Sequence, residues 1–152
     1  MAQAAPAVKT ARVAGAAAAG ADDRIGPVLG SAIVRAGGIA VARTGLLPED
    51  AGAFAEGELV RTLVLGPSRD PILPSAATLT LELTHHRSGG RLLAAEAAGP
   101  DGVDRAIDVL AAAIQGGMTV AALAGLDLAY APPYAPPIDP VNAAAAVAAR
   151  SS

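Results

Sequence analysis

A stretch of seven residues that alternates strictly between polar residues and leucine constrains the fold of this chain more than any other feature. Residues 78–84 read Thr-Leu-Thr-Leu-Glu-Leu-Thr, so every leucine falls on one face of an extended strand. One apolar and one polar face are typical of an antiparallel sheet that is covered on one side only. The turn-forming run 87–90 then predicts a hairpin, with a return strand at 91–98.

Further strands and helices are predicted on both sides of this hairpin. The other predicted strands are 31–35, 38–43 and 58–65. The predicted helices are 6–19, 48–57, 103–115, 119–125 and 139–150. Gly37-Gly38 marks a bulge or a turn, and Thr119 and Asp139 have the side chains of helix N-caps. The sequence therefore predicts an α+β fold, an antiparallel sheet of about four to five strands with helices packed on one face.

Composition and charge exclude several classes of function. A net charge of −3 gives no electrostatic footprint for nucleic acid. The absence of cysteine excludes disulfides, thiolate nucleophiles and Cys-ligated metals, and we expect no metal site. The sequence also has no phosphate-binding glycine loop and no G-x-S-x-G motif. We therefore expect neither a complete dinucleotide site nor a serine nucleophile.

No segment is predicted to enter a membrane. The most apolar run, 103–131, is interrupted by charged residues and glycines, unlike a transmembrane helix. The apolar stretch that follows Lys9 and Arg12 consists almost entirely of alanine and glycine, too weak for a secretory signal. We expect a cytoplasmic location.

His85 and His86 are adjacent at the end of the predicted strand 78–84. Neighbouring side chains on a strand point to opposite faces, so this pair cannot chelate one metal ion in regular geometry. The sequence predicts an exposed shoulder of the hairpin for both.

The segment 129–137 contains both tyrosines of the chain, Tyr130 and Tyr134, among four prolines. Its composition predicts an extended, polyproline-like path. Pro133 and Pro136 have the spacing of an SH3 ligand, but no basic residue flanks them. Two alternatives remain: the prolines stiffen a crossing segment whose Tyr rings are packed, or the segment presents its phenols at an interface.

The same segment carries a family resemblance. Residues 125–134, followed by Asp139-Pro140-Val141-Asn142, resemble the signature that closes the dimerisation domain of FAD-dependent pyridine nucleotide-disulfide oxidoreductases. The branch that it resembles contains the coenzyme A disulfide reductases and NADH oxidases. Supporting similarities lie at 7–15, 28–34, 42–46, 102–109 and 117–120. The resemblance divides the chain into 1–26, similar to the end of a flavin-binding domain, and 27–150, the dimerisation domain.

The resemblance implies how such a domain works. Two subunits pair through it, and its last segment approaches the partner's flavin and redox cysteine, which brings Tyr130 and Tyr134 near an active site in trans. FAD and NAD(P)H belong to the parent family, whereas this chain has no complete site for either. We expect it to be catalytically silent alone. The expected partner is a second copy or a subunit that carries the flavin and nicotinamide domains.

Three departures from the family pattern qualify this interpretation. Ile72-Leu73-Pro74 stands where relatives often have aromatic residues before a proline, and Ala106 stands where an arginine is common. The His-Pro…Glu pair of glutathione-reductase-like members is absent. One alternative function is a self-standing homodimeric interaction module without a catalytic role, and another is an independent enzyme.

Overall fold

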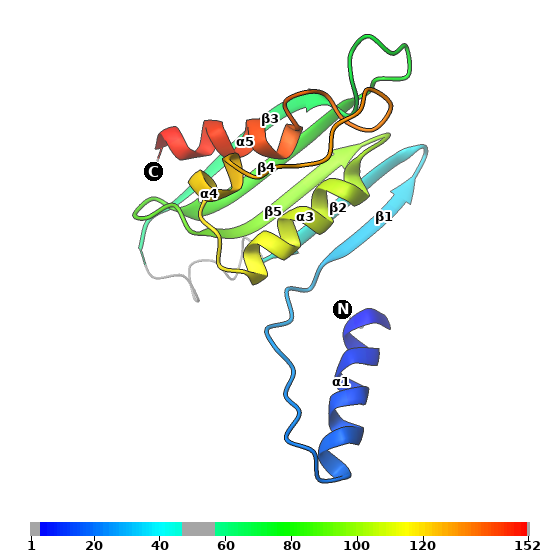
Figure 1. Ribbon diagram of the computed structural model, residues 1–152, viewed down its shortest axis with the longest axis vertical. Coiled ribbons are helices and arrows are strands. Elements are labelled where there is room, and N and C mark those ends of the chain that lie inside the picture. The colour runs from blue at the N-terminus through cyan, green and yellow to red at the C-terminus, as the bar shows by residue number, and fades with distance from the viewer. Residues whose placement is uncertain (1–3, 47–56, 152) are drawn as a thin grey trace.

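The computed structural model describes residues 4–46 and 57–151, and Figure 1 shows their arrangement. The predicted helix at 48–57 lies outside these residues apart from its last position. In the part of the chain that the structure describes, no helix is both long and apolar enough to cross a bilayer.

Five antiparallel strands form a single sheet in the order β1-β2-β5-β4-β3. Their bounds are β1 Ala32–Ala36, β2 Ile39–Gly45, β3 Leu59–Pro67, β4 Thr78–His86 and β5 Leu92–Gly99. Gly37 and Gly38 have φ values of 57° and 84°, so they form a two-residue turn of the hairpin type rather than a bulge. The α+β fold predicted from the sequence is confirmed.

Three helices cover one face of the sheet: α3 Val103–Gln115, α4 Val120–Ala124 and α5 Pro140–Ala148, which continues into a short 3-10 turn at Ala149–Ser151. The alternating leucines Leu79, Leu81 and Leu83 are buried beneath them, as the pattern of 78–84 predicts. Buried alanines of α5, Ala144, Ala145 and Ala148, let that helix lie close to the sheet. Small side chains are therefore what α5 presents to the sheet.

The other face of the sheet has no covering element among the described residues, and we call it the open face. Its exposed apolar side chains are Val34, Ile39, Val41, Leu63 and Leu65. Charged side chains lie across its centre: Arg43, Arg61, Glu82 and Glu96. The open face therefore has charged side chains between an apolar margin on β1 and β2 and a second apolar margin on β3.

The helix α1, Ala4–Ala18, lies apart from the sheet in Figure 1. None of its residues is buried. An ion pair of 3.0 Å between Arg12 and Asp23 connects α1 to the segment that leads to β1. The predicted helix at 6–19 is confirmed, whereas the division of the chain at residue 26 stays a prediction.

The prediction of an exposed hairpin shoulder is wrong for His85. Its side chain is completely buried, and its Nδ1 lies 2.9 Å from the carbonyl oxygen of His86. The strand β4 continues to His86, so His85 falls on the same face as Leu79, Leu81 and Leu83. The burial pattern places His86 on the opposite face, as predicted.

Candidate functional site

The segment between α4 and α5 carries both candidate phenols at the surface. Tyr130 is 51% exposed and Tyr134 is 74% exposed. Neither ring is buried within the described chain. The extended path also ends earlier than predicted, because residues 132–134 form a turn in which Tyr134 N donates to the Ala131 carbonyl at 2.8 Å. The hydrogen bond closes a four-residue turn that begins at Ala131, so Pro132 is its second residue, a position that proline favours.

Both ends of the segment are anchored to α5 and α3. Asp139 accepts a hydrogen bond of 2.8 Å from Val141 N through Oδ1, which confirms it as the N-cap of α5. Its other oxygen, Oδ2, pairs with Arg105 of α3. The amide of Asn142 lies 3.1–3.2 Å from the carbonyl oxygens of Leu123, Ala124 and Leu126. The tyrosines therefore lie on a span whose start and end are both fixed.

Tyr130 is also held at its side chain. Its Oη donates to Asp70 Oδ2 at 3.3 Å, and Asp70 N donates to the Pro132 carbonyl oxygen at 3.1 Å. Partial desolvation, together with the negative charge of Asp70 and its hydrogen bond, raises the pKa of Tyr130 above its ordinary value. The phenol is therefore in its neutral, hydrogen-donating form at physiological pH.

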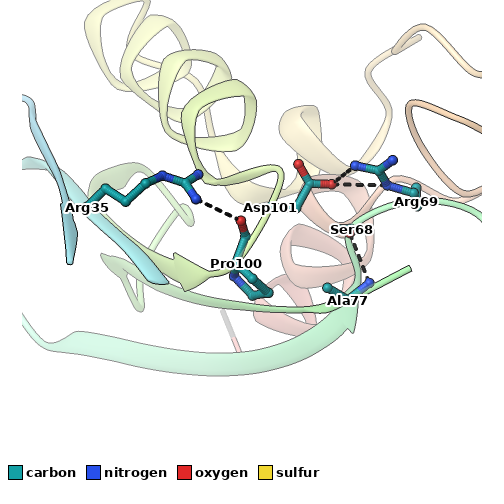
Figure 2. A network of polar contacts seen from close by, with 6 residues as sticks. All are labelled: Arg35, Ser68, Arg69, Ala77, Pro100 and Asp101. Carbon is teal, nitrogen blue, oxygen red and sulfur yellow. Dashed lines mark hydrogen bonds and ion pairs between the residues drawn. The ribbon is translucent and has the colours of Figure 1, made fainter. Parts of the chain in front are cut away.

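Asp70 lies in the connection between β3 and β4, which is itself well ordered by hydrogen bonds. Ser68 N donates to the Ala77 carbonyl at 2.8 Å, and Ala77 N donates back to Ser68 Oγ at 3.2 Å. Figure 2 shows that Arg69 and Asp101 point toward each other next to this pair. The loop is thus closed at its base and tied to the connection between β5 and α3.

The Arg69–Asp101 ion pair changes the pKa of its carboxylate. Arg69 donates through Nε to Asp101 Oδ2 at 3.1 Å and also through Nη2. These hydrogen bonds and the charge of Arg69 lower the pKa of Asp101, against the opposing effect of desolvation. Arg35 of β1 donates to the carbonyl of Pro100, the residue before Asp101, at 3.3 Å, so these contacts bring together strand β1, the β3–β4 connection and the β5–α3 connection.

Two hollows lie away from the tyrosines. A groove of about 680 Å³ runs between α1, residues 24–33 and α3. A shallower depression of about 470 Å³ lies between the end of β3 and the β3–β4 connection. Neither Tyr130 nor Tyr134 lines them. Both phenols therefore lie at the surface and outside these two hollows.

The described residues do not fit a dinucleotide cofactor or a metal ion. All strand pairs are antiparallel, whereas a dinucleotide cradle forms where a parallel strand turns into a helix. At the turn into α3, Asp101 places a carboxylate that is paired with Arg69. Among residues 4–46 and 57–151, no group of three or more His, Cys, Asp or Glu side chains could hold a metal.

Sequence reasoning identified Tyr130, Tyr134 and Asp139 but missed Asp70 and the role of Asn142. Asp70 and Tyr130 are 60 residues apart, and no local pattern connects them. Asn142 stands inside the signature that carried the family resemblance. Its position after Asp139-Pro140 could therefore have marked it as important. The carbonyl groups that it contacts could not be predicted from the sequence.

Comparisons with known proteins support the family resemblance described above. No protein-family model matches the chain. An NAD(P)H coenzyme A polysulfide/persulfide reductase from Pyrococcus horikoshii is 34% identical over 134 residues, which are 88% of this chain and 29% of that protein. A coenzyme A disulfide reductase from Staphylococcus aureus is 41% identical over 69 residues, which are 45% of this chain and 16% of that protein.

A solved structure agrees over nearly the whole chain. The NAD-dependent persulfide reductase from A. fulgidus has a TM-score of 0.88 and 35% identity, covering 93% of this chain and 26% of its own. The chain thus spans less than a third of each protein that it matches.

The fold and these relatives define the class: the chain corresponds to one domain of a larger oxidoreductase. Its homologues are coenzyme A disulfide and NAD(P)H persulfide reductases, and it matches a small part of these pyridine nucleotide-disulfide oxidoreductases. Its coverage of the solved structure is consistent with the C-terminal domain of that family.

Proposed function

We propose that this chain is the dimerisation domain of a flavin-dependent pyridine nucleotide-disulfide oxidoreductase and contributes Tyr130 and Tyr134 to a partner's active site. The observation that carries the proposal is the presentation of both phenols on a span anchored at each end, where the chain's own fold leaves them exposed. An exposed phenol on a fixed backbone is suited to meet a group supplied by another polypeptide.

Tyr130 acts in this proposal as a hydrogen-bond donor to a thiolate, a peroxide or a substrate sulfur. A neutral phenol stabilises negative charge that develops on such an atom without needing to lose its own proton. The flavin and the redox cysteine belong to the other domains, and this chain supplies only the donor and its scaffold. The proposal includes residues 1–26 as the end of a flavin-binding domain and a cytoplasmic location.

The experiment supplies the missing domains. The flavin and nicotinamide domains of a related enzyme are fused to this chain, and the turnover of Tyr130→Phe is compared with that of the unsubstituted fusion. Loss of one preorganised donor lowers turnover by roughly 10²–10³-fold. The melting temperature changes little, because phenylalanine keeps the ring. Unchanged turnover with a lowered melting temperature would make Tyr130 a structural residue and overturn the proposal.

Tyr134→Phe is the matched control, because it removes the same atom from the same segment. Tyr134 is the more exposed of the two and lies beyond the turn at 132–134. We expect a smaller loss of turnover than for Tyr130→Phe. Light scattering on the isolated chain checks the pairing separately, and a dimer at tens of micromolar is the expected state.

A second candidate function is a self-standing homodimeric interaction module, and the open face favours it. Val34, Val41, Leu63 and Leu65 are each more than half exposed on that face. Apolar side chains gathered on one uncovered sheet face are typical of a surface that another protein covers. If the isolated chain dimerises while Tyr130→Phe leaves the turnover of the fusion unchanged, this function replaces the first.

A further inference from the structure

We propose that Asp70 is the positioning residue for Tyr130: it fixes the direction of the phenol and holds its single O–H hydrogen until a negative atom of a partner takes the place of the carboxylate. This inference rests on the proposed function, since it assigns a second residue to the same site. Asp70 comes from the β3–β4 connection, whereas Tyr130 comes from the segment between α4 and α5.

The carboxylate of Asp70 is itself rigidly placed. Its Oδ1 accepts a hydrogen bond of 3.0 Å from Ile72 N, and its main-chain carbonyl accepts one of 3.0 Å from Leu73 N. An aspartate that bonds the backbone two residues ahead forms a compact turn of its own. One carboxylate oxygen is thus used to shape the loop, and Oδ2 is left to face Tyr130.

Two cross-connections between the loop and the tyrosine segment act together. Asp70 N donates to the Pro132 carbonyl at 3.1 Å, and Tyr130 Oη donates to Asp70 Oδ2 at 3.3 Å. The first fixes the backbone of the segment and the second fixes the far end of the ring. A tyrosine has only two side-chain torsions between its backbone and its ring. The contact at Pro132 and the contact at the Tyr130 hydroxyl together restrict the position of the ring.

The charge of Asp70 also determines what the phenol can do chemically. A tyrosinate next to this carboxylate would lose the hydrogen bond and gain a like-charge repulsion. The raised pKa of Tyr130 agrees with this geometry. The neighbouring cation Arg69 is paired with Asp101. Tyr130 therefore keeps its proton, and its single O–H bond must turn from Asp70 to donate to a negative atom of a partner.

The composition of the chain allows a direct test. The chain contains two tyrosines and no tryptophan, so a Tyr134→Phe chain has Tyr130 as its single titrating chromophore in the near ultraviolet. The absorbance of the tyrosinate is followed against pH in that background, with and without Asp70→Asn. Asparagine keeps the shape of the side chain and removes its charge. Circular dichroism at each pH records the folded range.

We expect Asp70→Asn to move the titration of Tyr130 to lower pH, whereas Asp70→Glu retains part of the original position. The matched control is the same Asp70→Asn change in a Tyr130→Phe chain, where only Tyr134 titrates and the curve stays in place. An unmoved Tyr130 curve, or an equal movement in the Tyr134 control, overturns the proposal.

A second measurement at neutral pH covers the case in which alkali unfolds the chain first. A carboxylate that accepts the phenol hydrogen bond quenches tyrosine emission, so Asp70→Asn raises the emission of the Tyr134→Phe chain and leaves that of the Tyr130→Phe chain unchanged. Equal emission with and without Asp70→Asn in both chains argues against the pair as strongly as an unmoved titration.

Neither measurement needs the flavin or nicotinamide domains, so this proposal and the proposed function fail separately. If Asp70→Asn moves the titration of Tyr130 but Tyr130→Phe leaves the turnover of the fusion unchanged, the Asp70–Tyr130 interaction is supported and the catalytic contribution of Tyr130 is overturned. If turnover falls while the titration does not move, the phenol acts without Asp70 and the positioning role is overturned.

Discussion

Glu82 on β4 and Glu96 on β5 lie directly opposite each other on the open face of the sheet. Arg61 donates to Glu82, and Arg43 stands opposite Glu96 on β2. Like charges at facing positions of neighbouring strands destabilise a sheet, and a neighbouring arginine acts in the opposite direction. The centre of the open face thus brings two acidic side chains together between two arginines.

Glu96→Gln is expected to stabilise the isolated chain by a few tenths to about 1 kcal/mol, because it removes one member of the facing pair. Glu82→Gln is the matched control and gains less, since it also breaks the contact with Arg61. Urea unfolding measures both variants, and the gain shrinks as salt is added. Destabilisation by Glu96→Gln at low salt would show that Arg43 outweighs the repulsion.

Asn142→Ala is expected to destabilise the chain by about 1–3 kcal/mol, because carbonyl groups at the end of α4 lose their donor. Asn142→Asp separates the hydrogen bonds from the volume of the side chain, since a carboxylate has the same shape and no hydrogen to donate. Chemical denaturation of both variants provides the comparison. A neutral Asn142→Asp would mean that the amide contributes packing alone.

Leu81→Ala is expected to cost about 2–5 kcal/mol, because it opens a cavity beneath the helices where the side chain is only 1% exposed. Leu63→Ala removes the same atoms from the open face, where the residue is 59% exposed. Its effect on the isolated chain is expected to lie within roughly 0.5 kcal/mol. Equal losses in thermal unfolding would contradict the assignment of the covered face.

Asp101 is expected to make stability depend on pH at the acid end. Its pKa is lowered from 3.8 by Arg69, so the unfolded chain binds more protons than the folded chain just below that pH. The contribution is complete above about pH 4 and is lost as the pH falls through the folded-state value. Asp101→Asn flattens this part of the curve, and the change stays small because the side chain is 42% exposed.

Thermal unfolding between about pH 2 and 5 measures this effect. Arg69→Gln is the companion variant, because it removes the other partner of the ion pair and is expected to flatten the same part of the curve. Parallel acid limbs for Asp101→Asn and the unsubstituted chain would mean that the Arg69 contact is not maintained in solution.

The sequence predicted most helices and strands correctly, because each is specified by residues within the element itself or directly next to it. The alternation at 78–84 identified the buried face of β4, and the helix at 103–115 has the bounds that its apolar spacing predicts. Thr119 and Asp139 cap α4 and α5 as expected, each through a side chain that accepts from the backbone. His85 was misplaced because the strand was ended two residues early, which hid its position on the leucine face.

The site was predictable only in part, because its contacts are long-range. The tyrosines were recognisable from their unusual segment, and the family resemblance gave them a role. Their actual support comes from Asp70 and Asn142, which act through hydrogen bonds that no spacing rule relates to the tyrosines. The turn at 132–134 also escaped prediction, since a proline-rich run is compatible with both an extended path and a turn.

The strand order has a consequence for how the chain reaches its fold. β5 is the last strand to be synthesised and lies between β2 and β4, so it joins the β1–β2 hairpin to the β3–β4 pair. A lone hairpin is marginal in water. The two pairs therefore remain unconsolidated during translation until residue 99 has emerged, and α3 then closes over the completed sheet. A ribosome that stalls before β5 is complete would hold two exposed β-hairpins. Exposed strands of this kind bind chaperones and are prone to aggregate.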